Sequence, residues 1–590
     1  MPAGYESVFE TETTAKSTWG QRMQGMLKNE PENWDAETDF LSVGSGIGGL
    51  SAAITAREMG LEAMVLEKAD QVGGVTALSM GEVWVAGNRH AADIGVEDSV
   101  ESGFRYLKRL SMDYGSDAAI LNFTAHAPAA LSWFEDRIGL KMMPIRGCPD
   151  YYYQVSNDGV PEGRMLEVEP FPGQSLGEWA EKTRLSQMPY GMTHADIDEG
   201  GGVANMIHWD FAKMAQRLEN DERCLGCGLA AYFVKGALDH GVEMKTGTSV
   251  VEIYADGSRV TGVRAQKDGQ DINIRARKGV LVAVSSYERR QDYNKTIGQQ
   301  LELGTIVTIS TVDGANFRLT GPLGARTARV PDVTSLGFIS PGEEDPEGYP
   351  MWRSALQIIG QPHIIVVNKA GERFGNEAFY RSFYYKIDQI DGLTQSHPNM
   401  PCFMIFDSQA RAKYPIGSIL PGMDWPEGLG CVADTLEELA GKIGIDAAAL
   451  KETVTTFNEG ARQGRDPAFG RGEQPWSFWM CGDKNNKPNP VLGPLEQGPF
   501  YAVELKRIGG SGIPSTGILA DEHGRALDWN DKPIPGLYVA GNSMARMETG
   551  AVMQSGISNA RGMTYGWLAA RHAAGQPSDL LAKEAERLAL

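Results

Sequence analysis

One stretch near the start of the chain constrains its fold more than any other: an apolar run at 39–43 that leads into a G-x-G-x-x-G turn. The run is typical of a buried strand, and residues 50–59 continue with small and apolar side chains at helical spacing. Gly44 makes the tight turn, Gly46 lets the backbone approach a pyrophosphate, and Gly49 lets the helix lie close on the strand. The positive N-terminus of the helix would face that pyrophosphate.

The acidic residue that such a unit requires is also present. A second strand expected at 62–66 ends in Glu67, roughly 20 residues past the glycines, where a carboxylate accepts hydrogen bonds from a ribose hydroxyl. Both ribose hydroxyls must be free for this contact, which favours FAD or NAD over NADP. A G-x-G-x-x-G match alone would be weak in a chain with 71 glycines, but strand, helix and acid agree. The sequence therefore predicts dinucleotide binding.

A second glycine-rich loop, at 73–81, helps to decide whether the dinucleotide is FAD or NAD. NAD-binding domains do not need such a loop. FAD enzymes of the glutathione-reductase type place one beside the pyrophosphate and the flavin, and the resemblance to them indicates FAD. The loop contains no histidine, so covalent attachment is not signalled and we expect non-covalent FAD.

Size and composition narrow the class of protein. At 590 residues the chain exceeds the size at which one core keeps growing, so we expect two domains. No apolar run of about 18 residues could span a bilayer, so we expect a soluble protein without a transmembrane segment. The net charge of −21 argues against binding to nucleic acid or anionic lipid, since both need a basic footprint.

Cysteines and histidines give no sign of a disulfide framework or a metal site. Six cysteines are sparse for this length and favour a reducing compartment, which we expect to be the cytoplasm. Cys224 and Cys227 form a C-x-x-C without a second pair at zinc-finger spacing, so we expect two packed thiols and no metal. Residues 1–38 are polar, lack the apolar core of a secretory signal and are expected to form a partly ordered arm.

The remaining periodicity alternates between helix and strand. Residues 92–140 show helical spacing, whereas 144–177 are rich in Pro, Gly and Tyr and form a loop that lines a pocket or wraps the surface. A helix at about 228–240 leads into a meander of strands and a buried run at 279–284. Residues 534–566 give a turn, a short strand and the start of a last helix, whose N-terminus would stabilise negative charge on a reduced flavin.

Several motifs in a fixed order resemble the flavoprotein family of fumarate reductase and succinate dehydrogenase, and within it the 3-ketosteroid dehydrogenases. The resemblance implies an α/β fold with a discontinuous Rossmann-like FAD-binding domain at 39–325 and 496–590, and an inserted α+β substrate or capping domain at 326–495. The motifs that carry it lie at 73–88, 149–152, 368–377, 466–472, 487–495 and 498–503.

The resemblance also implies which residues hold the cofactor. In flavoproteins of this kind, the strand after the helix at 228–240 brings a backbone amide to the adenine, which would be Val250 or Val251. The full set expected to bind FAD is Gly44, Ser45, Gly46, Gly48, Gly49, Glu67, Lys68, Gly73, Gly74, Val75, Thr76, Met80, Gly81, Val251, Gly541, Asn542, Gly556 and Ile557.

Members of this family transfer hydride between the flavin and a carbon near a carbonyl or carboxyl group, while a side chain moves the partner proton. Arg381 occupies the place where fumarate reductases have a proton-delivering arginine, and Tyr380 beside it keeps a phenol open as the shuttle. The alternative is that Arg381 is a surface or Glu-paired arginine. Tyr501 matches a tyrosine that polarises the ketone in ketosteroid dehydrogenases, or it is an aromatic packed under the cofactor.

Two departures from the dicarboxylate reductases bear on the substrate. Where those enzymes have a histidine and an arginine, this chain has Ile513 and Met553, so a dicarboxylate would lose its charge clamps. Three interpretations remain: a ketosteroid-dehydrogenase-like enzyme that desaturates or reduces next to the ketone of a bulky apolar ring, an ene-reductase for a carboxylated enoate, and a non-catalytic flavin-binding electron-transfer protein. The expected partners are a small apolar ketone or enone and an external electron acceptor or donor.

Overall fold

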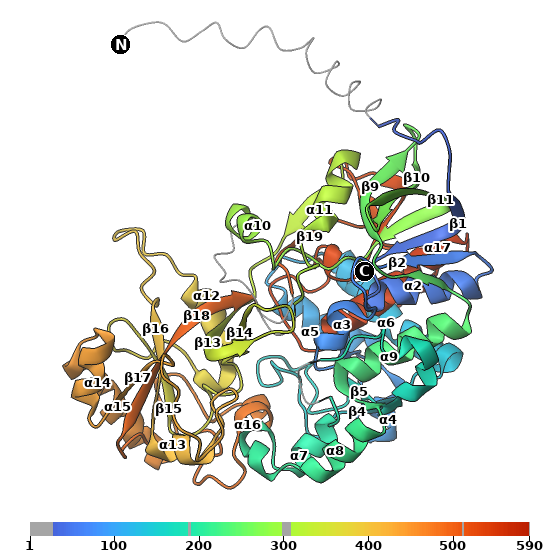
Figure 1. Cartoon of the computed structure of the whole chain (residues 1–590). Coiled ribbons are helices and arrows are strands. Elements are labelled where there is room, and N and C mark those ends of the chain that lie inside the picture. The colour runs from blue at the N-terminus through green and yellow to red at the C-terminus, as the bar shows by residue number, and fades with distance from the viewer. Residues whose placement is uncertain (1–26, 187–189, 298–307, 510–512, 589–590) are drawn as a thin grey trace, which may run out of the picture.

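The computed structural model describes residues 27–186, 190–297, 308–509 and 513–588. The expected arm at 1–38 lies outside these residues up to position 26. Its last part is ordered: Lys28 forms a β-bridge with Asp256, and the amide of Asp35 donates to the carbonyl of Asn273. Two sheets dominate the described chain, and Figure 1 shows them as two separate lobes.

The first sheet has eight strands, which come from the N-terminal and the C-terminal parts of the chain. Its parallel centre runs in the order β21, β11, β1, β2, β8, and the G-x-G-x-x-G turn follows the central strand β1. Parallel strands are covered on both faces, which explains their continuous apolar runs. The strands are β1 (Ala36–Val43), β2 (Ala63–Leu66), β8 (Glu243–Lys245), β9 (Ser249–Ala255), β10 (Val260–Lys267), β11 (Gln270–Val282), β20 (Arg525–Leu527) and β21 (Pro533–Val539).

A close helix pair joins the N-terminal and C-terminal parts of the chain. α2 (Ile47–Glu58) packs along α17 (Ile557–Ala573), which is drawn in red beside the blue strands in Figure 1. A Cβ on Gly566 would lie 2.4 Å from the carbonyl oxygen of Gly48, so only glycine permits this approach. The two ends of the chain therefore build one domain.

The second sheet has six strands and lies at the lower left of Figure 1, flanked by α13, α14 and α15. Its central strand β18 pairs with β13 on one side and with β16 on the other. Because β18 belongs to this sheet, we propose that the second domain boundary lies after residue 509 rather than at 496. The strands are β13 (Thr334–Glu344), β14 (Pro350–Ser354), β15 (Ile364–Asn368), β16 (Cys402–Asp407), β17 (Cys431–Ala433) and β18 (Phe500–Gly509).

Shorter elements connect the two sheets. The expected helical region at 92–140 contains α5 and the long α6, and the expected loop at 144–177 carries only short strands and a 3₁₀ helix. The remaining elements are α3 (Gly74–Leu78), β3 (Val83–Trp84), α4 (Arg89–Asp93), α5 (Val100–Leu110), α6 (Asp117–Ile138), β4 (Met142–Pro144), β5 (Met165–Val168), β6 (Phe171–Pro172), η1 (Gly173–Trp179), α7 (His194–Glu199), η2 (Val203–His208), α8 (Phe211–Glu219), β7 (Glu222–Arg223), α9 (Leu225–Asp239), α10 (Gln291–Thr296), α11 (Ala315–Thr320), η3 (Gly321–Leu323), β12 (Thr327–Arg329), η4 (Glu377–Phe383), α12 (Tyr384–Ile387), α13 (Ser408–Lys413), α14 (Leu436–Ile443), α15 (Ala447–Arg462), α16 (Pro475–Cys481), β19 (Thr516–Ile518), η5 (Gly541–Ser543) and α18 (Leu580–Leu588).

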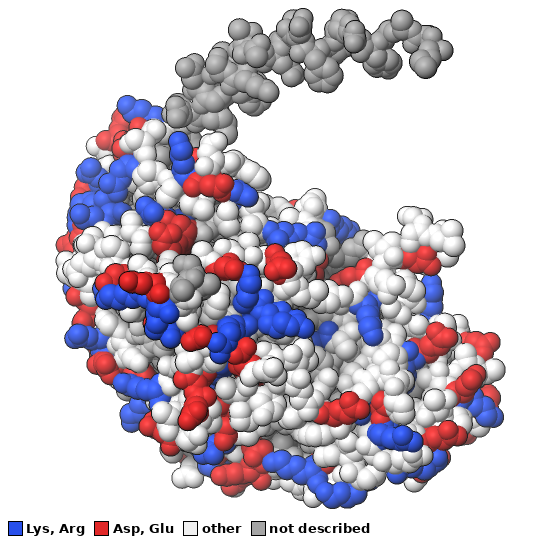
Figure 2. Space-filling model, turned by 180° about the vertical axis from the view of Figure 1, so that it is seen from behind, with Lys and Arg blue, Asp and Glu red and all other residues white. Residues whose placement is uncertain are grey.

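The surface carries both signs of charge. On the face shown in Figure 2, Lys and Arg side chains are interspersed with Asp and Glu. Within the described ranges, none of the helices has the length and apolarity needed to cross a bilayer. Cys224 and Cys227 are buried at the start of α9 as free thiols, and burial raises the pKa of Cys227 to about 11.

Candidate active site

Two long helices begin at glycines that face one common cavity. The N-cap of α2 is Gly46 and the N-cap of α17 is Gly556, so neither N-cap residue has a side chain to bond the free N–H groups of its helix. Both glycines line the cavity. An uncapped helix N-terminus presents free N–H groups and a positive dipole end, which is the arrangement that binds a phosphate or another anion.

The three glycines of the turn have different structural roles. A Cβ on Gly44 would lie 2.4 Å from the carbonyl oxygen of Ala283, and one on Gly49 would lie 1.9 Å from that of Gly44. Around Gly46 the nearest atom to such a Cβ is Thr76 Oγ1 at 3.8 Å. Gly44 and Gly49 are thus required by the protein itself, whereas Gly46 keeps space free for a ligand.

This difference gives a testable contrast within one motif. We expect Gly46→Val to fold normally and to lose bound flavin, because its side chain enters the cavity where the pyrophosphate would lie. Gly49→Val should lower the melting temperature instead, since its side chain meets the backbone of Gly44. Circular dichroism and the flavin-to-protein absorbance ratio separate the two effects. A Gly46→Val protein that retains flavin would contradict the assigned role of the turn.

Glu67 stands at the end of β2 and supports the turn. Its carboxylate accepts hydrogen bonds from the Ser45 amide at 3.0 Å, the Ser45 hydroxyl at 2.6 Å and the Ala69 amide at 2.9 Å. Thr76 Oγ1 accepts from the amide of Ile47 at 3.1 Å and so links the second glycine-rich loop to α2. Since Glu67 and Thr76 also line the cavity, these residues both hold the turn and face the space for a ligand.

The cavity contains ≈ 2190 Å³ of space free of protein atoms, open solvent included, and it extends from the first sheet to the second. Of the residues expected to bind FAD, those that line it are Gly44, Ser45, Gly46, Gly48, Glu67, Lys68, Gly74, Val75, Thr76, Met80, Gly541, Asn542 and Gly556. Gly49, Gly73, Gly81, Val251 and Ile557 are not among its lining residues. Val250, the other candidate for the adenine contact, does line it.

The far end of the cavity is aromatic and apolar. It is formed by side chains from the loop after β4, from the junction with the second sheet and from α16. These residues are Tyr151, Leu356, Tyr380, Trp479, Met480, Ile513 and Met553. Ile513 and Met553, which replace the charged clamps of the dicarboxylate reductases, therefore lie at the cavity wall.

Arg381 is buried directly behind this wall. Its guanidinium donates at 2.8 Å to the carbonyl oxygen of Met553 and at 3.0 Å to the hydroxyl of Tyr380, and its Cζ lies 3.7 Å from the ring centroid of Tyr151. No Asp or Glu within the described ranges forms an ion pair with it. Burial alone would lower the pKa of Arg381, but the surrounding phenols outweigh burial and raise the pKa. The arginine is therefore a charged group enclosed by aromatic rings.

Tyr501 does not reach the cavity. It lies on β18, where its ring stacks on Phe406 at 4.9 Å and meets Trp425 edge-on at 5.1 Å. It is not among the residues that line the cavity. The structure thus places Tyr380 and Arg381 at the site and leaves Tyr501 in the packing of the second sheet.

A buried ion-pair cluster holds the segment that carries Tyr380 and Arg381. Glu377 at the start of η4 pairs with Arg373 at 2.6 Å and with Arg471 at 3.2 Å, and Arg373 also pairs with Asp466 at 2.8 Å. These charges are buried, so each depends on its partner for compensation. The cluster fixes η4 against the second sheet and positions its side chains at the domain junction.

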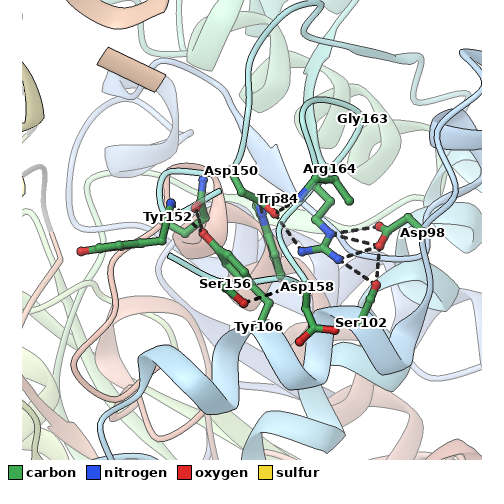
Figure 3. A network of polar contacts seen from close by, with 12 residues as sticks. Trp84, Asp98, Ser102, Tyr106, Asp150, Tyr152, Ser156, Asp158, Gly163 and Arg164 are labelled. Atoms are coloured by element: carbon green, nitrogen blue, oxygen red, sulfur yellow. Dashed lines mark hydrogen bonds and ion pairs between the residues drawn. The ribbon is translucent and has the colours of Figure 1, made fainter. Parts of the chain in front are cut away.

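A second buried network positions Tyr151 (Figure 3). Asp150 accepts from Trp84 Nε1 at 2.8 Å and from Arg164 at 2.8 Å, and Arg164 also pairs with Asp98 at 2.7 Å. Burial raises the pKa of Asp150, whereas for Asp98 the bonds and the charge of Arg164 outweigh burial and lower the pKa. Because Tyr151 follows Asp150 in the chain, the network holds the backbone from which its side chain extends.

Among the polar residues that line the cavity and that sequence reasoning did not select are Glu82, Tyr151, His194 and Ser555. For Tyr151 a signal existed, since the Pro-Asp-Tyr motif at 149–151 carried part of the family resemblance. Glu82 lies just before β3 and Ser555 just before α17, and the two residues are 473 positions apart in the chain. Only the packing of these two elements shows that they belong to one site.

Comparison with known proteins agrees with this geometry. The model of the FAD binding domain matches residues 39–558. The chain is 31% identical to a 4-oxocyclohexanecarboxylate 2-dehydrogenase of Sinomonas cyclohexanicum, covering 91% of this chain and 93% of that protein. It is 30% identical to a 3-oxosteroid 1-dehydrogenase of Mycolicibacterium smegmatis, covering 90% of this chain and 96% of that protein.

Solved structures give the same grouping. A 3-ketosteroid delta1-dehydrogenase from Sterolibacterium denitrificans, in complex with 1,4-androstadiene-3,17-dione, superposes with a TM-score of 0.81 at 29% identity and covers 91% of this chain and 99% of its own. A flavocytochrome c3 fumarate reductase shares the fold, with a TM-score of 0.59 at 19% identity, covering 98% of this chain and 83% of its own. The predicted fold class and the FAD cofactor are confirmed, and the chain belongs to the FAD-binding-domain family of oxidoreductases that contains the 3-ketosteroid dehydrogenases.

Proposed function

We propose that this enzyme introduces or removes a carbon-carbon double bond next to the ketone of a ring substrate, with FAD bound non-covalently. One observation carries the proposal: a single cavity joins two helix N-termini that begin at glycine to an aromatic chamber that contains two phenols. The first half suits a dinucleotide, and the second suits a flat apolar ring whose reacting carbon must exchange a proton.

The residues at the first half fit FAD. Gly46 leaves room for a pyrophosphate beside α2, Glu67 faces the ribose position, and Gly556 opens α17 toward the flavin. Bound FAD would supply the hydride acceptor or donor, and the protein would supply the proton transfer and the donors to the carbonyl oxygen.

We assign the proton transfer to a cavity phenol, Tyr380 or Tyr151, rather than to Arg381. The raised pKa of Arg381 disfavours its deprotonation, so it is a poor acid or base. Its fixed positive charge acts in the direction that lowers the pKa of both phenols, although burial, the larger effect, leaves both values raised. Arg381 thereby stabilises any negative charge that develops on a neighbouring phenol or on the substrate oxygen.

The cavity walls favour a ring ketone over fumarate. A carboxylate buried against Ile513 and Met553 without a partner would cost several kcal/mol. We therefore expect fumarate to reoxidise the reduced flavin at least about 10-fold more slowly than a cyclic enone does, as measured by stopped-flow absorbance. Fast reoxidation at low fumarate concentration would favour the enoate interpretation instead.

A second candidate substrate class is a ring ketone that carries one carboxylate. The specific observation in its favour is Arg381, a buried cation with no acidic partner among the described residues, close behind the cavity wall. A relative at 31% identity is a 4-oxocyclohexanecarboxylate 2-dehydrogenase. A ketosteroid and 4-oxocyclohexanecarboxylate, mixed separately with the oxidised enzyme, distinguish the two classes by which of them bleaches the flavin.

Acid precipitation tests the mode of flavin attachment, because non-covalent FAD is released into the supernatant and covalent flavin stays with the pellet. If no ketone or enone changes the flavin spectrum, the protein is a non-catalytic flavin carrier. The cytoplasmic location and the external electron partner stay predictions from the sequence and the family.

A further inference from the structure

Beside Tyr151 the cavity contains a carboxylate that the proposed reaction has not yet used. Glu82 precedes β3, and its Oε2 accepts a hydrogen bond at 3.0 Å from the hydroxyl of Ser555, which lies just before α17. The hydroxyl of Tyr151 interacts in turn with Ser555. All three side chains line the same cavity, so phenol, hydroxyl and carboxylate form one continuous chain of hydrogen-bonding groups.

The backbone holds this chain in place. A Cβ on Gly556 would lie 2.5 Å from the amide nitrogen of Trp84, so the start of α17 packs directly on β3. Asn559 on α17 donates at 2.9 Å to the carbonyl oxygen of Glu82. These contacts bring Ser555 and Glu82 together. They leave the Glu82 side chain 14% exposed, with its other oxygen 3.8 Å from His194 Nε2.

We infer that Glu82 and Ser555 form a proton relay behind Tyr151, with the Glu82 carboxylate as the proton acceptor during dehydrogenation. The inference rests on the proposed function. As the substrate C–H bond breaks toward Tyr151, the phenol passes its own proton to Ser555, and Ser555 passes its proton to Glu82. The adjacent carbon would give its hydride to bound FAD, so the substrate would lose one hydride and one proton in all, and the relay would deliver one proton to Glu82. Reduction of an enone runs the same path in reverse.

The relay explains how Tyr151 could accept a proton without first being ionised to a phenolate. A neutral phenol is a weak base, because it has a proton of its own to release, and burial raises the pKa of Tyr151. If that proton leaves for a carboxylate as the new one arrives, no phenolate has to exist before the reaction begins. Tyr380 lies beside Tyr151, but its hydroxyl already accepts a hydrogen bond from Arg381 and has no carboxylate in contact among the described residues.

The test measures flavin reduction by stopped flow with saturating 4-oxocyclohexanecarboxylate or a ketosteroid, whichever bleaches the wild-type flavin faster. We expect Glu82→Gln and Ser555→Ala to lower the limiting rate about 10²-fold or more, with the substrate dissociation constant and the flavin content unchanged. Formate should restore part of the rate in Glu82→Ala, because a small carboxylate can occupy the vacated place; a purely structural role for Glu82 would give no such rescue.

Glu162→Gln is the matched control. The Glu162 carboxylate belongs to the loop that carries Tyr151 but is not among the cavity-lining residues, it bonds to Arg146 at 2.9 Å, and we expect the rate to be retained. Wild-type rates in Glu82→Gln and Ser555→Ala would overturn the relay while leaving the proposed function in place. A wild-type flavin that neither ketone reduces, and whose reduced form no enone reoxidises, would instead overturn the proposed function and the relay with it.

Discussion

Tyr151→Phe is expected to slow flavin reduction by about 10²- to 10⁴-fold while the protein still binds FAD. The Arg381 guanidinium lies over the ring of Tyr151, whose hydroxyl interacts with Ser555, the partner of Glu82; removing that hydroxyl would leave the reacting carbon without the proposed proton acceptor. The limiting rate of flavin bleaching in stopped flow, measured at several ketone concentrations, separates this effect from weaker binding.

Two neighbouring variants rank the alternatives. Arg381→Lys keeps the charge but loses the stacking on Tyr151 and the planar fork that bonds to Met553 and Tyr380, so we expect a smaller but clear loss, up to about 10²-fold. Tyr380→Phe should cost least. If Tyr380→Phe is the crippling change and Tyr151→Phe is not, then Tyr380 moves the proton; if only Arg381→Lys is inactive, then the arginine does.

Tyr153→Phe is the matched control for the phenol series. Tyr153 lies two positions after Tyr151 in the same loop and is 36% exposed. Like Tyr151→Phe, this substitution removes a phenolic oxygen from the loop, but from a residue that does not line the cavity. We expect wild-type kinetics; a loss comparable to that of Tyr151→Phe would mean that any change in this loop disturbs the site.

Arg164→Met is expected to destabilise the protein by about 3–5 kcal/mol, because it leaves two buried carboxylates without their common partner. Arg164, Asp98 and Asp150 each have side chains no more than 1% exposed. Urea unfolding followed by circular dichroism gives the shift in midpoint. Since Asp150 precedes Tyr151, we also expect slower flavin reduction in the fraction that remains folded.

Arg146→Met provides the comparison in the same loop. Its pair with Glu162 has a similar distance, 2.9 Å, but the Arg146 side chain is 63% exposed. Solvent-exposed ion pairs contribute little to the free energy of unfolding, so the midpoint should hardly move. If both variants shifted the urea midpoint equally, burial would not determine how much an ion pair contributes to the free energy of unfolding.

For the cofactor end of the cavity, the sequence prediction relied largely on one short stretch of the chain. Strand β1, the glycine turn and α2 are adjacent in the chain; a Cβ on Gly49 would meet the backbone of Gly44 within this unit, whereas one on Gly44 would meet Ala283 after β11. The cavity accordingly contains most of the residues expected to bind FAD. For the adenine contact, the sequence left two candidates, Val250 and Val251. Val250 lines the cavity and Val251 does not.

The catalytic half could be predicted only in part. Tyr380 and Arg381 follow a motif that resembles the family and do lie at the site. Tyr501 shares a motif too, but neighbouring strands decide its place, because its ring stacks on Phe406 of β16. The spacing of residues in the sequence does not predict which face of a strand lies toward the cavity, because that depends on the sheet to which the strand belongs.

By itself, the sequence determined the dinucleotide unit, the FAD cofactor and the family, since these depend on spacing within short segments and on several motifs in order. Only the tertiary structure decided that β18 completes the second sheet, that Arg381 is enclosed by aromatic rings without an acidic partner in the described ranges, and that Glu82 meets Ser555. The physical reason is that these contacts join segments far apart in the chain, and their geometry depends on how whole elements pack.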